Sequence, residues 1–203
     1  TRHTWAELAP HVGTGPAAAI IAHERVVRRE TLDGLELPSV LDLPWHLERW
    51  EPHYLLPEFR VDGVIEATPP DVQTKSAEGA TRERQPVDAA ARALVDLVRT
   101  WTSSSNGRAE AVGVIGSAAD AVATLGPAGM RLAELSHREA LALMAWGAAS
   151  GGAHGRRRGS AVGRFDAWWV AAQLAGFEGL PEPDELGAAV QELRWYCWDA
   201  YDP

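Results

Sequence analysis

The spacing of apolar side chains predicts a mainly helical chain. Over residues 86–101 they recur at the helical period, with Asp88, Arg92 and Asp96 along the opposite face. Ser136, followed three residues later by Glu139, forms the capping box that begins a helix. Together with comparable patterns elsewhere, these signals predict helices over residues 16–30, 86–101, 117–125, 137–149, 159–176 and 183–198.

Four of these helices, at 86–101, 137–149, 159–176 and 183–198, are expected to build the core. The helix over 159–176 carries Phe165, Trp168 and Trp169 on one face and has almost no polar residues in its second half. It is therefore expected to be buried nearly all round. The last helix is expected to continue an apolar stripe as far as Cys197.

Signals for β-strands are few. Residues 60–67 carry valine and isoleucine around Gly63, and residues 109–115 are the candidate partner strand. The predicted fold class is therefore a mainly α, bundle-like single domain with at most two short β-strands.

Proline and glycine mark residues 68–85 as an exposed loop or linker. It separates an irregular N-terminal region, residues 1–67, from a helical body, residues 86–203, within what we expect to be one domain. A connection of this length is either a lid over a site or a disordered surface segment. The absence of recognisable catalytic groups in it favours the disordered segment.

Composition and charge exclude several classes of protein. With 46% hydrophobic and 23% charged residues, this tryptophan-rich chain has the make-up of a soluble globular protein. Its formal net charge of −9 argues against general nucleic-acid binding, and no apolar run is long enough for a membrane span. A single cysteine, Cys197, and the lack of a basic-then-apolar start predict a cytoplasmic protein.

The most distinctive chemistry lies in residues 150–164, where arginines stand among glycines in an otherwise acidic chain. Glycine-rich backbone leading into a helix, with guanidinium groups beside it, can hold a phosphate or a carboxylate. Neither nucleotide-binding glycine fingerprint is present. The candidate anion site consists of His154, Arg156, Arg157, Arg158 and Arg164.

The same segment also has a structural interpretation. Gly155, Gly159 and Gly163 recur every fourth residue, which lets a neighbouring helix approach closely. The arginines would then pair with internal carboxylates, and His154 would bond to backbone. We favour this interpretation, because most charge clusters in proteins are solvated or paired.

No residues mark a metal site or a catalytic centre. His46, Glu48, Glu51 and His53 form the densest group of potential ligands, but their spacing matches no standard zinc motif. A surface cluster is favoured, and neither a metal nor a cofactor is expected. Cys197 lies in an apolar stripe, where a thiol is ordinary packing.

Parts of the C-terminal third resemble an uncharacterised protein family from actinobacterial-type genomes. The resemblance implies no activity and assigns no role to the arginines or to His154. It rests on Ser150-Gly151-Gly152-Ala153-His154-Gly155-Arg156-Arg157-Arg158-Gly159, on Gly163-Arg164-Phe165 with Trp168-Trp169, and on Leu193-Arg194-Trp195 with Trp198-Asp199.

Two hypotheses for function follow. The first is a non-enzymatic interaction or scaffold module that binds a protein partner through the arginine segment or an aromatic surface. The second is an enzyme or binding protein for a small anionic ligand, a phosphate or carboxylate, at residues 150–164. Neither involves nucleic acid or a membrane, and both are compatible with an oligomer. A small ligand would raise the Tm on its own, whereas a scaffold would respond only to a protein.

Overall fold

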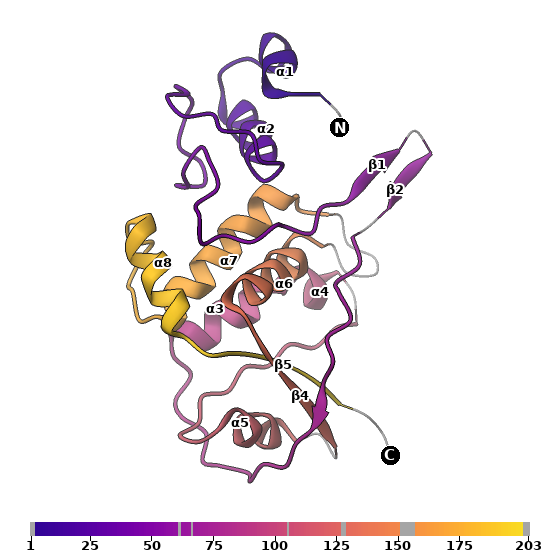
Figure 1. Cartoon of the computed structure of the whole chain (residues 1–203), viewed down its shortest axis with the longest axis vertical. Coiled ribbons are helices and arrows are strands. Elements are labelled where there is room, and N and C mark those ends of the chain that lie inside the picture. The colour runs from indigo at the N-terminus through magenta and orange to yellow at the C-terminus, as the bar shows by residue number, and fades with distance from the viewer. Residues whose placement is uncertain are drawn as a thin grey trace.

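Helices account for most of the regular structure. A computed structural model describes residues 3–60, 62–65, 67–104, 106–126, 129–150 and 157–200. Eight helices lie within these residues: α1 (Trp5–Val12), α2 (Pro16–Val26), α3 (Ala89–Leu97), α4 (Arg99–Ser103), α5 (Ala118–Leu125), α6 (His137–Ala149), α7 (Ser160–Leu174) and α8 (Pro183–Glu192). α6 and α7 lie side by side at the centre, and α3 and α8 also contact α7 (Figure 1).

Local signals placed several helix ends correctly. The capping box at Ser136 begins α6, where the amide of Glu139 donates to the Ser136 hydroxyl and the Glu139 carboxylate accepts from the Ser136 amide. Ser117 caps α5 in the same way. The helix predicted over residues 86–101 is divided into α3 and α4, because the backbone of Val98 (φ −106°, ψ 22°) leaves the helical range.

The mainly α fold class is confirmed, but the limit of two short strands is wrong. Residues 109–115 contain no strand, and residues 60–67 contribute to a hairpin instead. The other strands pair segments far apart in sequence, which periodicity does not reveal. The described residues hold five antiparallel strands: β1 (Glu58–Arg60) pairs with β2 (Gly63–Ile65), and β4 (Met130–Leu135) lies between β3 (Lys75–Ser76) and β5 (Trp195–Ala200).

The end of the last predicted helix is therefore also corrected. α8 ends at Glu192, and Trp195 begins β5, in which Cys197 lies opposite Ala133 of β4. Aromatic residues favour strands, and pairing with β4 outweighs the helical spacing of the apolar stripe. Burial raises the pKa of the Cys197 thiol, which suits the packing role expected for it.

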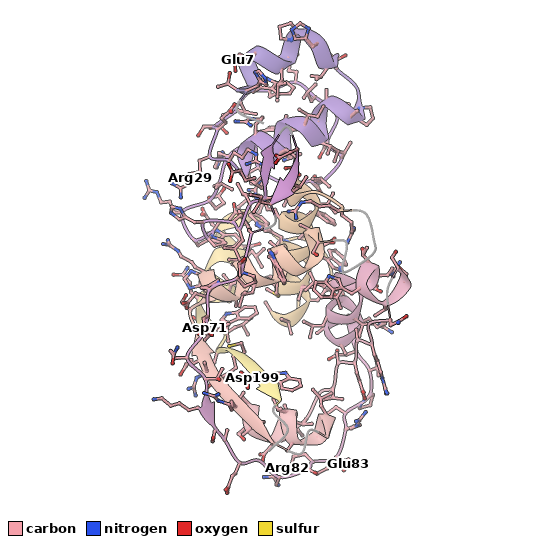
Figure 2. The ribbon with its side chains drawn as sticks, turned by 90° about the vertical axis from the view of Figure 1, so that its right-hand side faces the viewer. Glu7, Arg29, Asp71, Arg82, Glu83 and Asp199 are labelled. Atoms are coloured by element: carbon pink, nitrogen blue, oxygen red, sulfur yellow. The ribbon has the colours of Figure 1, made fainter. Side chains whose placement is uncertain are left out.

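Residues 68–85 run over the surface and are held against α5 by hydrogen bonds. The amide of Ala80 donates to Asp120 at 2.8 Å, and the amide of Arg82 donates to the Thr124 hydroxyl at 2.9 Å. Figure 2 shows Arg82 and Glu83 at the end of the molecule opposite α1. These hydrogen bonds and the pairing of β3 with β4 give the segment a defined course. The hypothesis of a disordered segment does not account for these contacts. No helix in the described part of the chain has the length and apolar content to cross a bilayer.

Close contact between α6 and α7 depends on Gly163. A Cβ atom there would lie 2.3 Å from the carbonyl oxygen of Ala145 and 2.9 Å from the Cβ of Ala149. Gly159 precedes α7 at φ +104°, and Gly155 lies outside the described residues. Of the two glycines of the predicted row that the structure describes, Gly163 is the one that lies on a helix and faces its neighbour.

The two adjacent tryptophans of α7 have different environments. Trp168 is the largest fully buried side chain and packs on Trp50, with ring centroids 4.7 Å apart. Trp169 is 36% exposed, because successive helical residues turn by about 100°. The expectation that this helix is buried nearly all round is therefore wrong at Trp169.

Replacing these two tryptophans should have unequal effects on stability. Trp168→Ala should lower the free energy of unfolding by about 3–5 kcal/mol, because it leaves a large cavity in the core. Trp169→Ala should cost no more than about 1–2 kcal/mol. Urea denaturation followed by far-UV circular dichroism measures both values. Equal losses would contradict the orientation of α7.

Candidate functional site

Arg164, one of the five residues of the candidate anion site, lies in the core and is fully buried. Its Nε and Nη2 atoms donate to the two carboxylate oxygens of Glu51 at 2.8 and 2.7 Å. It also donates to the carbonyl oxygens of Pro44 and His46, at 3.0 and 2.8 Å. The guanidinium of Arg164 is therefore engaged inside the protein and has no surface to offer a ligand.

Glu51 is the common acceptor of this buried network. Besides Arg164, it accepts hydrogen bonds from the Tyr54 hydroxyl at 2.5 Å and the Trp168 indole at 3.0 Å. Burial and the charge of Glu51 raise the pKa of Tyr54 well above its usual value, so the phenol stays protonated. Burial acts to lower the pKa of Arg164, but the charge and hydrogen bonds of Glu51 outweigh it and raise that pKa.

Arg157 and Arg158 lie elsewhere and line an open cavity between α1, α2 and the start of α7. This cavity, of about 460 Å³, is called the arginine pocket below. Its lining combines aliphatic side chains with four arginines and one glutamate: Leu8, Val12, Ile21, Glu24, Arg25, Arg28, Arg157, Arg158 and Gly159.

The arginines of the pocket come from two segments far apart in sequence. Arg25 pairs with Glu30 at 2.6 Å, and Arg158 pairs with Asp166 at 2.5 Å. Arg28 has a lowered pKa, first because it is partly buried and then because Arg25 and Arg157 are close, although Glu24 opposes this. The lining itself holds four guanidiniums and one carboxylate, and Glu30 and Asp166 outside it offset two of the positive charges.

Glu24 already occupies the start of α7. The amide of Ala161 donates to its carboxylate at 2.8 Å, which is the position an anionic ligand takes at a helix N-terminus. Gly159, just before α7, has a φ of +104°, which L side chains rarely adopt, so a glycine is favoured there. An anion in the pocket would thus be held by guanidinium groups rather than by this amide.

The structure places the predicted residues as follows. Arg157 and Arg158 share a pocket, Arg164 lies apart from them, and His154 and Arg156 fall outside the described residues. Sequence analysis missed Arg25 and Arg28. Their spacing of three residues at the end of α2 was a signal, but only the tertiary fold brings them to Arg157.

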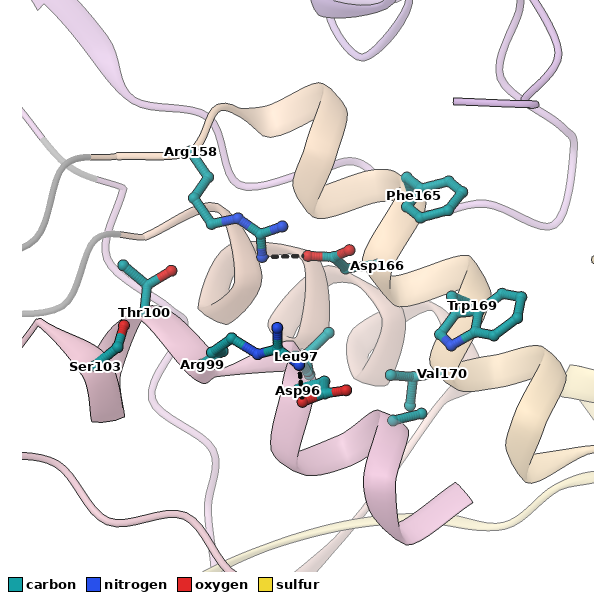
Figure 3. Close-up of a pocket in the computed structure, with 11 residues that line it drawn as sticks. Asp96, Leu97, Arg99, Thr100, Ser103, Arg158, Phe165, Asp166, Trp169 and Val170 are labelled. Carbon is teal, nitrogen blue, oxygen red and sulfur yellow. Dashed lines mark hydrogen bonds and ion pairs between the residues drawn. The ribbon is translucent and has the colours of Figure 1, made fainter. Parts of the chain in front are cut away.

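A second cavity, of about 470 Å³, runs along α7 where it faces α3 and α4 (Figure 3). This cavity, called the polar groove below for its charged and hydroxyl side chains, also has an aliphatic part; it is lined by Ala93, Asp96, Leu97, Arg99, Thr100, Ser103, Arg158, Phe165, Asp166, Trp169 and Val170. Burial raises the pKa of Asp166, although the charge of Arg158 opposes this.

The predicted cluster of histidines and glutamates is divided between surface and core. His46 lies between Asp33 and Glu48, with its Nδ1 2.6 Å from Asp33 and its Nε2 3.0 Å from Glu48. The hydrogen bond to Asp33 is the main reason why the pKa of His46 is raised. Glu51 turns inward to Arg164. Among the described residues, no three His, Cys, Asp or Glu side chains are grouped to hold a metal ion.

His23 is a buried histidine next to the Arg164 network. Its ring stacks on Trp45, with centroids 4.1 Å apart, and its Nδ1 has no hydrogen-bond partner within the described part of the chain. Burial, followed by the charge of Arg164, lowers the pKa of His23 to about 4.

Comparison with known protein families identifies the family of this chain. The model of a family of unknown function, DUF6183, matches residues 1–203. No curated protein and no solved structure matches the chain. The resemblance to an uncharacterised family is thereby confirmed and extends over the whole chain, whereas the actinobacterial origin stays a prediction.

The Glu51–Arg164 pair should show strong energetic coupling. Arg164→Met should lower the free energy of unfolding by about 3–5 kcal/mol, because it leaves the Glu51 carboxylate buried without a counter-charge. Glu51→Gln combined with Arg164→Met removes both charges and keeps an acceptor for Tyr54 and Trp168. The double variant should be more stable, by about 2–3 kcal/mol, than is predicted by adding the losses of Arg164→Met alone and Glu51→Gln alone. Additive losses in urea denaturation would show that the two side chains act independently.

The burial of His23 should make the fold sensitive to mild acid. Between pH 6.5 and about 4 the unfolded chain binds a proton at His23 that the folded chain does not, so stability should fall as the pH falls through this window. The full loss would be about 3 kcal/mol. His23→Phe keeps a ring against Trp45 and should flatten the curve of unfolding free energy against pH. An unchanged curve would exclude His23 as its cause.

Proposed function

The chain belongs to the DUF6183 family, whose function is unknown, and from its geometry we propose that it binds a small amphipathic anion in the arginine pocket. The ligand class is a carboxylate or phosphate joined to a hydrophobic group. One observation carries this proposal: arginines at and just beyond the end of α2 line the same cavity as Arg157 and Arg158, together with aliphatic side chains.

The size and the apolar part of the pocket fit such a ligand. A volume of about 460 Å³ is within the usual range of small-molecule sites. Leu8 and Val12 of α1 and Ile21 of α2 supply aliphatic contact surface. A bare phosphate would leave this surface in water, whereas a hydrophobic tail would cover it.

The charged part of the pocket selects for an anion. Guanidinium groups bind carboxylates and phosphates through paired, charge-assisted hydrogen bonds. Arg28 lies near two other arginines, and an anion beside it would offset their repulsion. Glu24 is the single acidic residue of the lining, and it is bonded to the backbone of α7.

A protein-interaction module is the second candidate function. Trp169 and Trp198 are large aromatic side chains that remain 36% and 43% exposed, and such residues are common in interface cores. In this role the arginine segment would meet an acidic partner surface in the cytoplasm. A protein that responds to no small anion would favour this candidate.

Binding of the anion can be tested with three probes of matched size or charge. Decanoate carries both parts of the proposed ligand, decanol only the tail, and inorganic phosphate only the charge. At equal ionic strength and below micelle-forming concentrations, decanoate should raise the Tm by several degrees, and the other two should not. The gain should weaken with added salt, because the pocket is open. An equal effect of decanol would contradict a charge-dependent site.

Variants of the pocket provide the control. Arg28→Gln and Arg157→Gln should each weaken decanoate binding at least tenfold in calorimetry. Arg92→Gln removes the same charge from an exposed position on α3 and should leave the Kd unchanged. If all three variants bind like the parent, decanoate does not bind in the arginine pocket.

A further inference from the structure

The polar groove differs from the arginine pocket in its charge balance. Its lining contains two carboxylates and two guanidiniums, and each is already paired within the groove. Asp96 pairs with Arg99 at 2.6 Å, and Asp166 pairs with Arg158 at 2.5 Å (Figure 3). A charged or zwitterionic ligand would compete with these pairs for their partners, at a cost that grows with the burial of Asp166.

The paired groups can still bind a neutral ligand. A carboxylate has about four acceptor positions and a guanidinium has five N–H donors, so one ion pair does not exhaust either. Thr100 and Ser103 add hydroxyl groups at the same end of the groove as Arg158 (Figure 3). A ligand hydroxyl can donate to a carboxylate and accept from a guanidinium at once. A neutral ligand with many hydroxyl groups therefore matches this lining.

The aromatic residues add an apolar surface at the other end. Phe165 and Trp169 line the polar groove and also a neighbouring cavity of about 480 Å³, which includes Ser39 and Asp42. The two aromatic side chains therefore border both cavities, and Val40, Leu41 and Leu180 add further apolar surface to the second one. The C–H faces of a sugar ring are apolar and can pack on an indole, while the hydroxyl groups at its edge reach the polar side chains.

From this combination we infer that the polar groove binds a neutral oligosaccharide, with one sugar ring on Trp169 and its neighbours in the cavities on either side. The inference does not depend on the arginine pocket. Arg158 lines both cavities, but Trp169 and Asp166 line the polar groove and not the arginine pocket.

The indole N–H signals of the tryptophans allow a direct test. In the ¹⁵N spectrum of the full chain, the signal of Trp169 is the one lost in Trp169→Phe. Titration with maltotetraose, cellotetraose and xylotetraose should shift this signal for at least one sugar and leave the signal of buried Trp168 in place. If none of the three moves the Trp169 signal, the inference is wrong.

Matched variants and a zwitterionic ligand test whether the sugar binds in the polar groove. Trp169→Ala and Asp166→Asn should each weaken the binding of the active sugar at least tenfold in calorimetry. Trp198→Ala removes the other exposed tryptophan and should leave the Kd unchanged. Equal weakening by Trp198→Ala would place the sugar elsewhere and overturn the inference. A stronger shift of the Trp169 signal with the zwitterion glycylglycine than with any sugar would also overturn it.

Discussion

The buried pair of Glu51 and Arg164 ties an irregular part of the chain to α7, beside the packing of Trp50 on Trp168. Residues 41–57 contain three prolines and no helix or strand, yet they bury Leu41, Leu43 and Tyr54. Arg164 of α7 bonds to two carbonyl oxygens of this segment and to both oxygens of Glu51. Because each of these acceptors has a fixed position, the irregular segment can lie on α7 in only one register.

The position of α7 in turn determines what the protein presents to solvent. Gly163 sets the helix close to α6, and Trp168 fills the space beside Trp50. With those two sides fixed, Trp169 must point outward between two cavities, and Arg157 and Arg158 must approach α2. Both candidate binding sites are therefore consequences of one helix whose rotation the buried ion pair fixes.

The helices could be predicted because their signals lie within a few residues of each other. The strands and the buried ion pair could not, because they join residues far apart in sequence. Caps such as Ser136 and Ser117 act over three residues, so the sequence alone locates α5 and α6. β5 depends on β4, some sixty residues earlier, and its aromatic residues fit a helical stripe as well as a strand. Arg164 shows the same limit at the site. It lies on the buried stripe with Ala167, Trp168 and Ala171, which marks it as internal, but its partner is 113 residues away.

Arg158 is the one side chain that the arginine pocket and the polar groove have in common among their described linings. Arg158 adds a positive charge to the lining of the arginine pocket. In the polar groove the same charge is balanced by Asp166. Without it, the half-buried carboxylate of Asp166 would lose its counter-charge, and its pKa, already raised by burial, would rise further. The groove would then hold either a proton or an uncompensated negative charge. The different ligand classes of the two sites therefore both depend on the position of this arginine at the start of α7.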